Sequence, residues 1–478
     1  MEEGLLVKER EVKRERLTWG VIGQEAKRLC YIAGPMAAVT LSQFLLPMIS
    51  LMMVGHLGEL SLSSSSIAIS FCNVIGFSVL LGMASALETL CGQAYGAQQY
   101  KKLGTQTYTA IFCLLIVCIP LSIIWIYLGR ILILVGQDPL ISHEAGTFAT
   151  WLIPALFGYA TLQPLIRFFQ MQSLTFPMFI ISCITIVFHT VLSWVLVYKS
   201  GLQNHGAALA MDVSMWFNVI ILGLYMSYCS SCAQTRAPIS MEMFHGVKEF
   251  FRFAIPSAVM ICLEWWSYEL MILSSGLLPN PELETSVLSV CLSTISTLYS
   301  IPYGLSAAVS TRVSNELGAG NSEGARIPVI CAVILAFTEM IIVNTALFAS
   351  RHVFGYVLSG DKEVVDYVTI MAPLVCLSVV MDSFQGTLSG VARGCGWQHI
   401  GAYINLASFY LVGIPIALAL GFVAKLEGKG LWIGILSGAT VQTLLLSIVT
   451  ACTNWEKQAI KAKERLFQEK IPAEDGPI

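Results

Sequence analysis

The sequence predicts an all-α membrane protein with twelve transmembrane helices in two parallel-repeat lobes of six helices each. Three observations predict it: 56% of the 478 residues are hydrophobic and 12% charged, twelve apolar runs follow one another, and the two halves repeat. Soluble domains carry about 25% charged residues. The composition therefore excludes an ordinary soluble protein, a disordered chain and a disulfide-stapled secreted domain.

Each apolar run is long enough for a membrane span, which needs about 20 mostly apolar residues. The predicted spans are 30–54, 64–90, 105–128, 146–169, 175–198, 206–229, 253–276, 285–310, 327–349, 364–390, 398–424 and 430–452. They leave no segment for a soluble catalytic domain. No His-Glu-x-x-His motif occurs, and the glycine-rich segment 318–324 lacks the Lys-Ser/Thr of a phosphate loop. We therefore expect no enzyme, no metal and no cofactor.

The domain organisation follows from charge. Residues 1–29 are predicted to be a cytosolic tail, because they lack the apolar core of a signal peptide. Residues 30–230 form the N-lobe, 231–250 a cytosolic linker, 251–452 the C-lobe and 453–478 a cytosolic C-terminal tail. With both tails in the cytosol, 21 of the 27 Lys and Arg residues lie on the cytosolic side. This bias follows the positive-inside rule.

An internal repeat relates the two lobes. Pro35 and Pro256 lie in similar segments with an offset of 221 residues, and the pairs Gly82/Gly304 and Gly96/Gly318 have an offset of 222. Six spans per half is an even number, so the repeats run parallel about an axis along the membrane normal. Secondary transporters have this architecture and handle substrate between their two lobes.

Two acidic residues are the main candidates for a functional site. Glu264 lies near the middle of span seven and Asp382 near the middle of span ten. Two carboxylates in one low-dielectric cavity favour uptake of a proton near neutral pH. The alternative is a pair of protonated acids that only hydrogen-bond neighbouring helices. Polar residues nearby predict a wet cavity: Tyr268, Ser293, Thr294, Ser296, Thr297, Tyr299 and Asn405.

The spans contain other charged or titratable residues. Because a charge in the hydrocarbon region costs free energy, each of them is expected to have a structural or functional role. Glu269 lies about 140° around the helix from Glu264, so it points elsewhere and belongs either to the site or to its rim. Glu339 is predicted to have a local partner. Glu88 and Arg167 serve packing, snorkelling or gating. His189 is either titratable or simply hydrogen-bonded.

Prolines interrupt several spans, and each removes a backbone hydrogen bond and permits a bend. The repeat-related pair Pro35 and Pro256 is predicted to mark hinges. A static kink at each position is the alternative.

Four segments resemble motifs of the multidrug and toxic compound extrusion (MATE) family. The residues of these segments look like those of its plant DETOXIFICATION branch. The segments are residues 53–60, 86–97, 302–320 and 390–398. The resemblance implies a V-shaped exporter in which Glu264 and Asp382 carry ion coupling, and Glu269 matches a second acid of animal relatives. Many prokaryotic members have an aspartate where this chain has Ser50.

The expected function is proton-coupled antiport by alternating access, exporting organic cations, xenobiotics or plant secondary metabolites. A sodium-coupled exporter and a lipid or glycolipid flippase are the alternatives. The net charge of −3 leaves no basic excess for nucleic acid. We expect a monomer in the plasma membrane, or alternatively in the vacuolar membrane.

Overall fold

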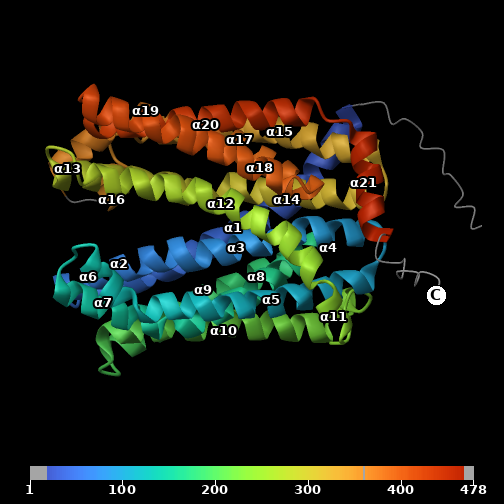
Figure 1. The fold of residues 1–478 in the computed structure, drawn as a ribbon, viewed down its shortest axis with the longest axis horizontal. Coiled ribbons are helices and arrows are strands. Elements are labelled where there is room, and N and C mark those ends of the chain that lie inside the picture. The colour runs from blue at the N-terminus through green and yellow to red at the C-terminus, as the bar shows by residue number, and fades with distance from the viewer. Residues whose placement is uncertain (1–18, 359–360, 468–478) are drawn as a thin grey trace, which may run out of the picture.

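The structure, a computed structural model, describes residues 19–358 and 361–467, and these residues form helices joined by short turns (Figure 1). Ten of the described helices are long and apolar enough to cross a membrane, and a bent pair raises this number to eleven. The predicted seventh span corresponds to α12 (Val247–Ser275), whose glutamates lower its hydropathy and keep it outside that group. The described part of the chain thus carries the predicted series of spans.

The helices of the first half are α1 (Trp19–Gly55), α2 (Glu59–Cys72), η1 (Asn73–Phe77), α3 (Ser78–Ala84), α4 (Leu87–Gly96), α5 (Tyr100–Ile126), α6 (Leu128–Leu134), α7 (Pro139–Trp151), α8 (Ile153–Met171), α9 (Thr175–Tyr198) and α10 (Gln203–Tyr228). The linker contains η2 (Ser230–Cys232) and α11 (Glu242–His245). The second half comprises α12, α13 (Pro281–Leu298), α14 (Ser300–Gly318), α15 (Ser322–Ala349), α16 (Gly355–Leu358), α17 (Lys362–Cys395), α18 (Gln398–Asn405), η3 (Leu406–Gly413), α19 (Ile414–Leu418), η4 (Ala419–Val423), α20 (Glu427–Ala451) and α21 (Trp455–Phe467).

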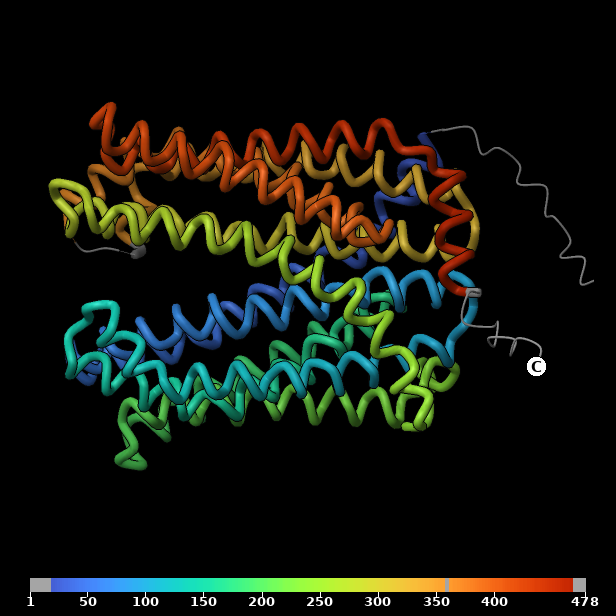
Figure 2. The backbone as a smooth tube through the Cα atoms, in the orientation of Figure 1, coloured from blue at the N-terminus to red at the C-terminus, as the bar shows by residue number. Residues whose placement is uncertain are grey.

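The two halves form two bundles that lie side by side (Figures 1 and 2). The bundles meet at the end that carries α4, α14 and α21, which we call the sealed end. They separate toward the opposite end, which carries α6 and the start of α13 and which we call the open end. α1 packs against α14, and α12 packs against α3, so each half is anchored to the other.

Repeat-related glycines make equivalent contacts between the halves. A methyl group on Gly82 would overlap the backbone of Ala258, and one on Gly304 would overlap the backbone of Ala33 and Ala37. Glycine lets two helix backbones approach closely. The contacts therefore repeat in space with the offset of 221–222 residues found in the sequence.

The same symmetry holds at the sealed end. A methyl group on Gly96 of α4 would overlap the backbone of Asn315, and one on Gly318 of α14 would overlap the backbone of Gln93. Gly96 and Gly318 are related by the 222-residue offset, and so are Gln93 and Asn315. These glycines allow α4 and α14 to pack tightly across the boundary between the halves.

Helices extend into both predicted tails. α1 begins at Trp19, eleven residues before the expected start of span one, because Glu25 and Leu29 are buried within the fold. The Glu25 carboxylate lies 2.6 Å from Nε of Arg312 on α14. The predicted C-terminal tail contains α21, and the predicted linker overlaps the start of α12. The rest of the N-terminal tail, residues 1–18, lies outside the described residues.

The proposed hinge prolines lie inside long helices. α1 continues through Pro35, and α12 continues through Pro256. A bend of 46° instead separates α7 from α8 within the fourth span. Helices widen to the π form at η1, η3 and η4, and such stretches are frequent at functional sites. Hinge motion at Pro35 and Pro256 therefore stays a prediction.

Candidate functional site

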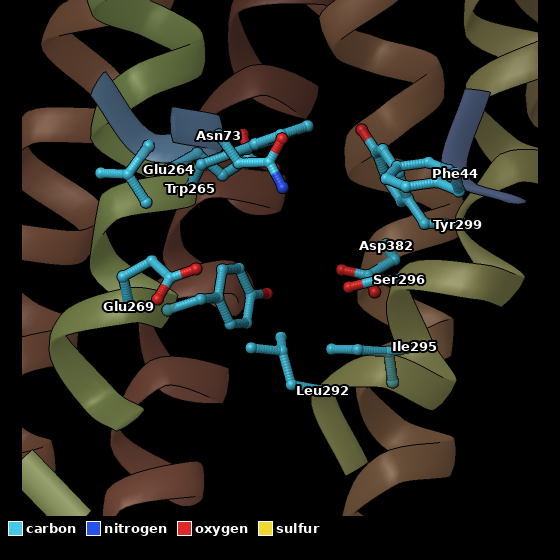
Figure 3. Close-up of a pocket in the computed structure, with 12 residues that line it drawn as sticks. Phe44, Asn73, Glu264, Trp265, Glu269, Leu292, Ile295, Ser296, Tyr299 and Asp382 are labelled. Atoms are coloured by element: carbon cyan, nitrogen blue, oxygen red, sulfur yellow. The ribbon is translucent and has the colours of Figure 1, made fainter. Parts of the chain in front are cut away.

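A cavity of about 210 Å³ lies between the two halves and contains both candidate acids (Figure 3). The first half contributes Phe44 from α1 and two residues of η1. α12 contributes the largest share, and α17 contributes Asp382. The lining residues are Phe44, Asn73, Val74, Glu264, Trp265, Tyr268, Glu269, Leu292, Ile295, Ser296, Tyr299 and Asp382. The structure thus brings Glu264 and Asp382 together, although 118 positions separate them in the sequence.

The Glu264 carboxylate is held by three neutral amide side chains. Nε2 of Gln385 donates to both of its oxygens at 2.9 and 2.8 Å. Nε2 of Gln442 donates to one of them at 3.1 Å, and Nδ2 of Asn405 donates to the same oxygen at 3.4 Å. Asn405 and Gln442 also bond to each other at 2.8 Å. Such donors stabilise a carboxylate without neutralising it.

Asp382 and Glu269 present their carboxylates to the cavity from opposite sides (Figure 3). Within the described residues, Asp382 has no hydrogen-bond donor, so its oxygens are available to a ligand or a proton. The sequence left Glu269 open between the site and its rim, and the structure places it in the lining of the cavity. The cavity is wide enough to be lined by four α12 positions, 264, 265, 268 and 269.

The predicted supporting residues divide into three groups. Tyr268, Ser296 and Tyr299 line the cavity. Asn405 does not line it but donates a hydrogen bond to the Glu264 carboxylate. Ser293 was expected in the cavity but is exposed and does not line it. The reason is helical periodicity: positions 292, 295, 296 and 299 share the cavity face, whereas 293 and 297 lie on another face.

Two predictions about isolated polar residues are consistent with the structure. Oγ of Ser383 donates to Glu339 at 2.6 Å, so Glu339 has the expected local partner. The His189 ring is fully buried, with Nε2 at 3.0 Å from the Leu46 carbonyl and Nδ1 at 2.9 Å from Ser214 Oγ. Ser50 Oγ also lies 3.2 Å from Nε2 of this histidine. His189 therefore ties α9 to α1 and α10.

A second cavity of about 110 Å³ adjoins the first on the side of the first half. Phe44, Asn73, Trp265 and Tyr299 line both cavities. Its remaining walls are mainly apolar and aromatic, with an amide pair formed by Gln43 and Gln163 at 3.1 Å. The residues specific to it are Met36, Val39, Thr40, Gln43, Pro47, Phe77, Leu81, Tyr159, Gln163, Ile166, Arg167, Met211, Met215 and Tyr303. This cavity offers apolar surface, whereas the first offers carboxylates.

Glu88 and Arg167 meet at the sealed end, where a third charged residue joins them. Oε1 of Glu88 lies 3.3 Å from Nε of Arg167, and Oε2 lies 2.9 Å from Nε of Arg393. All three side chains are buried. Arg393 belongs to α17 of the second half, so this cluster joins the halves directly.

Asn405 was predicted from the sequence, but Gln385 and Gln442, the other two amides on Glu264, and the role of Arg393 were not. Gln385 lies three residues beyond Asp382 and Gln442 lies in span twelve, so both were visible as polar residues within spans. The polar residues predicted around the two acids came from spans seven, eight and eleven, so the glutamines of spans ten and twelve were left out. Arg393 was treated as a cytosolic basic residue because it lies beyond the predicted end of span ten.

Comparison with known proteins places this chain in a family. The MatE family model matches it twice, over residues 35–195 and 256–419. The chain belongs to the MATE family. The two matches begin at Pro35 and Pro256, the prolines that the internal repeat pairs.

The curated relatives of this MATE protein include plant DETOXIFICATION proteins of Arabidopsis thaliana. It is 60% identical to Protein DETOXIFICATION 12 over 457 residues, which cover 95% of each chain. It is 61% identical to Protein DETOXIFICATION 14 over 444 residues, which cover 93% of this chain and 92% of the relative. The chain is therefore a plant-type MATE protein of the DETOXIFICATION branch.

Solved structures of MATE transporters also match this chain. The crystal structure of the eukaryotic MATE transporter AtDTX14 matches with a TM-score of 0.91 and 60% identity, over 93% of this chain and all of the other. An outward-facing multidrug resistance MATE transporter matches with a TM-score of 0.81 at 15% identity, over 93% of this chain and 98% of the other, and shows the fold alone. The protein has the V-shaped MATE fold and is a multi-pass membrane transporter of small organic substrates rather than an enzyme.

Proposed function

We propose that this protein is a secondary active antiporter that exports organic cations, xenobiotics or plant secondary metabolites in exchange for protons. The observation that carries the proposal is the cavity between the halves, in which Glu264, Glu269 and Asp382 face one space lined by aromatic side chains. A cation is attracted by the carboxylates and by the faces of aromatic rings. A proton competes with it for the same oxygens.

Glu264 is suited to exchange a proton because two opposing effects act on its carboxylate. The amides of Gln385, Gln442 and Asn405 stabilise the charged form. The low-dielectric surroundings between the helices stabilise the neutral form. Protonation of Glu264 and Asp382 removes the attraction for a cationic substrate and promotes its release.

The orientation that fits this cycle places the sealed end in the cytosol. Exposed basic residues lie at or near that end, as the positive-inside rule requires: Lys101, Lys248, Arg252, Arg326, Lys457 and Lys461. The open end then faces the opposite side, and we propose that this arrangement is an outward-facing state of an alternating-access cycle. We assign the plasma membrane as the site of export, with the vacuolar membrane as the alternative.

The driving force depends on the charge of the substrate. One pH unit is worth about 1.4 kcal/mol, and 100 mV is worth about 2.3 kcal/mol per elementary charge. A neutral substrate exchanged for one proton draws on both, which supports accumulation of several hundred-fold. A monovalent cation exchanged for one proton gains only the pH term, about tenfold per unit. Strong cation export would need more than one proton per cycle.

The test is proton flux in sodium-free proteoliposomes with an imposed pH gradient, on addition of the cationic dye ethidium. We expect dye-dependent proton movement in the wild-type protein. Glu264→Gln and Asp382→Asn should each lower it at least about tenfold, because an amide cannot release a proton at these pH values. Circular dichroism and gel filtration of each variant should match the wild type.

A matched control is Glu284→Gln. Glu284 is a buried acid on α13 whose carboxylate bonds Tyr367 and the Gly428 backbone, and it does not line the cavity. Its variant should keep dye-driven flux. Normal flux in Glu264→Gln would overturn the site assignment, and flux that appears only with sodium would make this a sodium-coupled exporter.

A further inference from the structure

We propose that Glu88, Arg167 and Arg393 form a seal between the two halves whose closure depends on the charge of Glu264. The proposal assigns these three residues a positioning role in transport, and it rests on the proposed function for the role of Glu264. The four residues lie on four different helices, α4, α8, α17 and α12.

The seal is a buried cluster of ion pairs and hydrogen bonds between the halves. The Arg167 guanidinium forms an ion pair with Glu88 and donates hydrogen bonds to Gln170 Oε1 and to the Tyr303 hydroxyl of α14, both at 2.7 Å. The Arg393 guanidinium donates to Ser306 Oγ at 2.8 Å. Thr89 donates its hydroxyl to the Arg393 carbonyl. Separation of the halves at the sealed end must break the Glu88–Arg393 and Arg167–Tyr303 contacts.

Helix α17 connects the seal to Glu264. Gln385, Ser389 and Arg393 follow at intervals of four residues, so they share one helix face. Gln385 holds Glu264 at one end of this row, and its amide also lies 3.3 Å from Ser389 Oγ. Glu264, Gln385, Ser389 and Arg393 line one small cavity together with Tyr299 and Tyr303. The Glu264 carboxylate thus faces the arginine that crosses to the other half.

The charges in this region balance only when Glu264 is ionised. The seal contains two arginines and one glutamate, which leaves one positive charge in a buried site. An ionised Glu264 compensates that charge through the shared cavity. A neutral Glu264 leaves it uncompensated, and an uncompensated buried charge is strongly destabilising. Protonation of Glu264 therefore weakens the seal.

Other ionisable groups face Glu264 and the seal. α17 presents Asp382, α12 presents Tyr268 and Glu269, and Tyr299 lies between α13 and α14. α18 and α20 present the amides Asn405 and Gln442, and α3, η1 and α19 contain no titratable residue. Tyr159 and Tyr303 lie beside Arg167. Among these groups, Glu264 is the carboxylate that shares the small cavity with Arg393.

The test measures the distance between the halves at the sealed end, without substrate, by pulsed electron paramagnetic resonance in nanodiscs. Spin labels are placed at Lys101→Cys, at the start of α5, and at Glu323→Cys, at the start of α15; both side chains are exposed. Native cysteines that are exposed or partly exposed are replaced by serine: Cys30, Cys183, Cys229, Cys376 and Cys452. Distances are compared at about pH 5.5 and about pH 8, which bracket the release of a proton by a buried carboxyl group.

In the wild-type protein we expect the long-distance population to rise at acidic pH. Glu264→Gln should show that population at both pH values. Glu88→Gln leaves at least one arginine uncompensated whether or not Glu264 is ionised, and should raise the ratio of long to short distances about tenfold at both pH values. Arg167→Met removes the surplus positive charge and should keep the short distance at both pH values.

The two seal variants are thus expected to act in opposite directions. A seal that is only structural would be loosened by both substitutions, so a shift of Glu88→Gln and Arg167→Met in the same direction would overturn the proposal. A wild-type pH response in Glu264→Gln would overturn it as well. Arg167→Lys keeps the charge and should keep the pH response, which covers the case in which Arg167→Met does not fold. Glu284→Gln is the control for loss of an unrelated buried acid.

The dye experiment tests the proposed function and the distance experiment tests the seal, so each proposal can be rejected without the other. Loss of dye-driven flux in Glu264→Gln with an unchanged pH response would retain the proposed function and reject the seal. A pH-dependent seal without dye-driven proton flux would retain the seal and reject the assignment of transport by proton exchange.

Discussion

At the scale of single residues, the fold surrounds the Glu264 carboxylate with hydrogen-bond donors from three helices. Its hydrogen-bond donors come from α17, α18 and α20, and each is a neutral amide. A basic partner would hold the group permanently ionised, because an adjacent positive charge favours the carboxylate. Neutral donors leave both protonation states accessible, as a proton-exchanging site requires.

Gln385→Met tests the role of the amides. It removes the donor to both oxygens of Glu264 while nearly conserving side-chain volume. A carboxylate that loses donors is less stable in its charged form. The pH at which dye-driven proton flux is half-maximal should therefore rise, by about one unit for each 1.4 kcal/mol of lost hydrogen bonding. The measurement is the pH profile of flux in proteoliposomes.

The control for this substitution is Gln172→Met. Gln172 is also a buried amide, but it bonds Thr235 and the Phe168 carbonyl, away from the cavity. Its pH profile should equal that of the wild type. An unchanged profile in Gln385→Met would show that this amide does not tune Glu264.

At the scale of helices, the closest approach between the halves at the sealed end is the packing of α4 on α14. Gly92, Gly96 and Gly318 leave no room for a methyl group there. Close packing of this kind fixes the relative position of two helices, because protein interiors cannot absorb an added methyl without displacement. These helices also carry Glu88 and Ser306, so the glycine contact sets the geometry of the seal.

Gly96→Ala should destabilise the protein by about 1–3 kcal/mol, because the new methyl group meets the Asn315 backbone rather than a movable side chain. The measurement is the thermal unfolding midpoint in detergent, which should fall. Gly34→Ala is the matched control on α1, since no atom lies within 4 Å of its added methyl group. That variant should be neutral or slightly stabilised, because alanine is the better helix former. Equal effects of the two substitutions would contradict the packing argument.

At the scale of the whole molecule, α21 lies across the sealed end and contacts both halves (Figure 1). Its Arg465 donates to the Cys395 carbonyl of α17 at 3.2 Å and to Gln93 Oε1 of α4 at 3.4 Å. Ala459, Ala462 and Leu466 form its buried face. The helix therefore links the two halves at the end where the Glu88 cluster also joins them.

Arg465→Met should favour separation of the halves at neutral pH. Two hydrogen bonds from a partly exposed arginine are worth about 1 kcal/mol, which corresponds to about a five-fold change in the ratio of long to short distances. The spin-label pair at positions 101 and 323 measures this ratio. Lys457→Met is the control, because Lys457 lies on the exposed face of the same helix. Equal distance distributions in the two variants would show that α21 does not link the halves.

The series of spans, the repeat and the principal acids could be predicted from the sequence, because they depend on local composition and on a constant offset. Glu264 and Asp382 stood out as charges within apolar runs, and the family motifs occupy short contiguous segments. The start of α1 and the helix α21 were not predicted, because charged segments form helices here through contacts with distant residues such as Arg312 and Cys395.

Which side chains meet could not be predicted from the sequence, because it depends on the packing of the helices. Glu269 lines the cavity and Ser293 does not, because the width and direction of the cavity depend on how α12, α13 and α17 are packed together. Gln385, Gln442 and Arg393 acquire their partners from helices that are remote in the sequence. A sequence determines the polarity of each span, whereas the partner of a buried polar group is a property of the packed bundle.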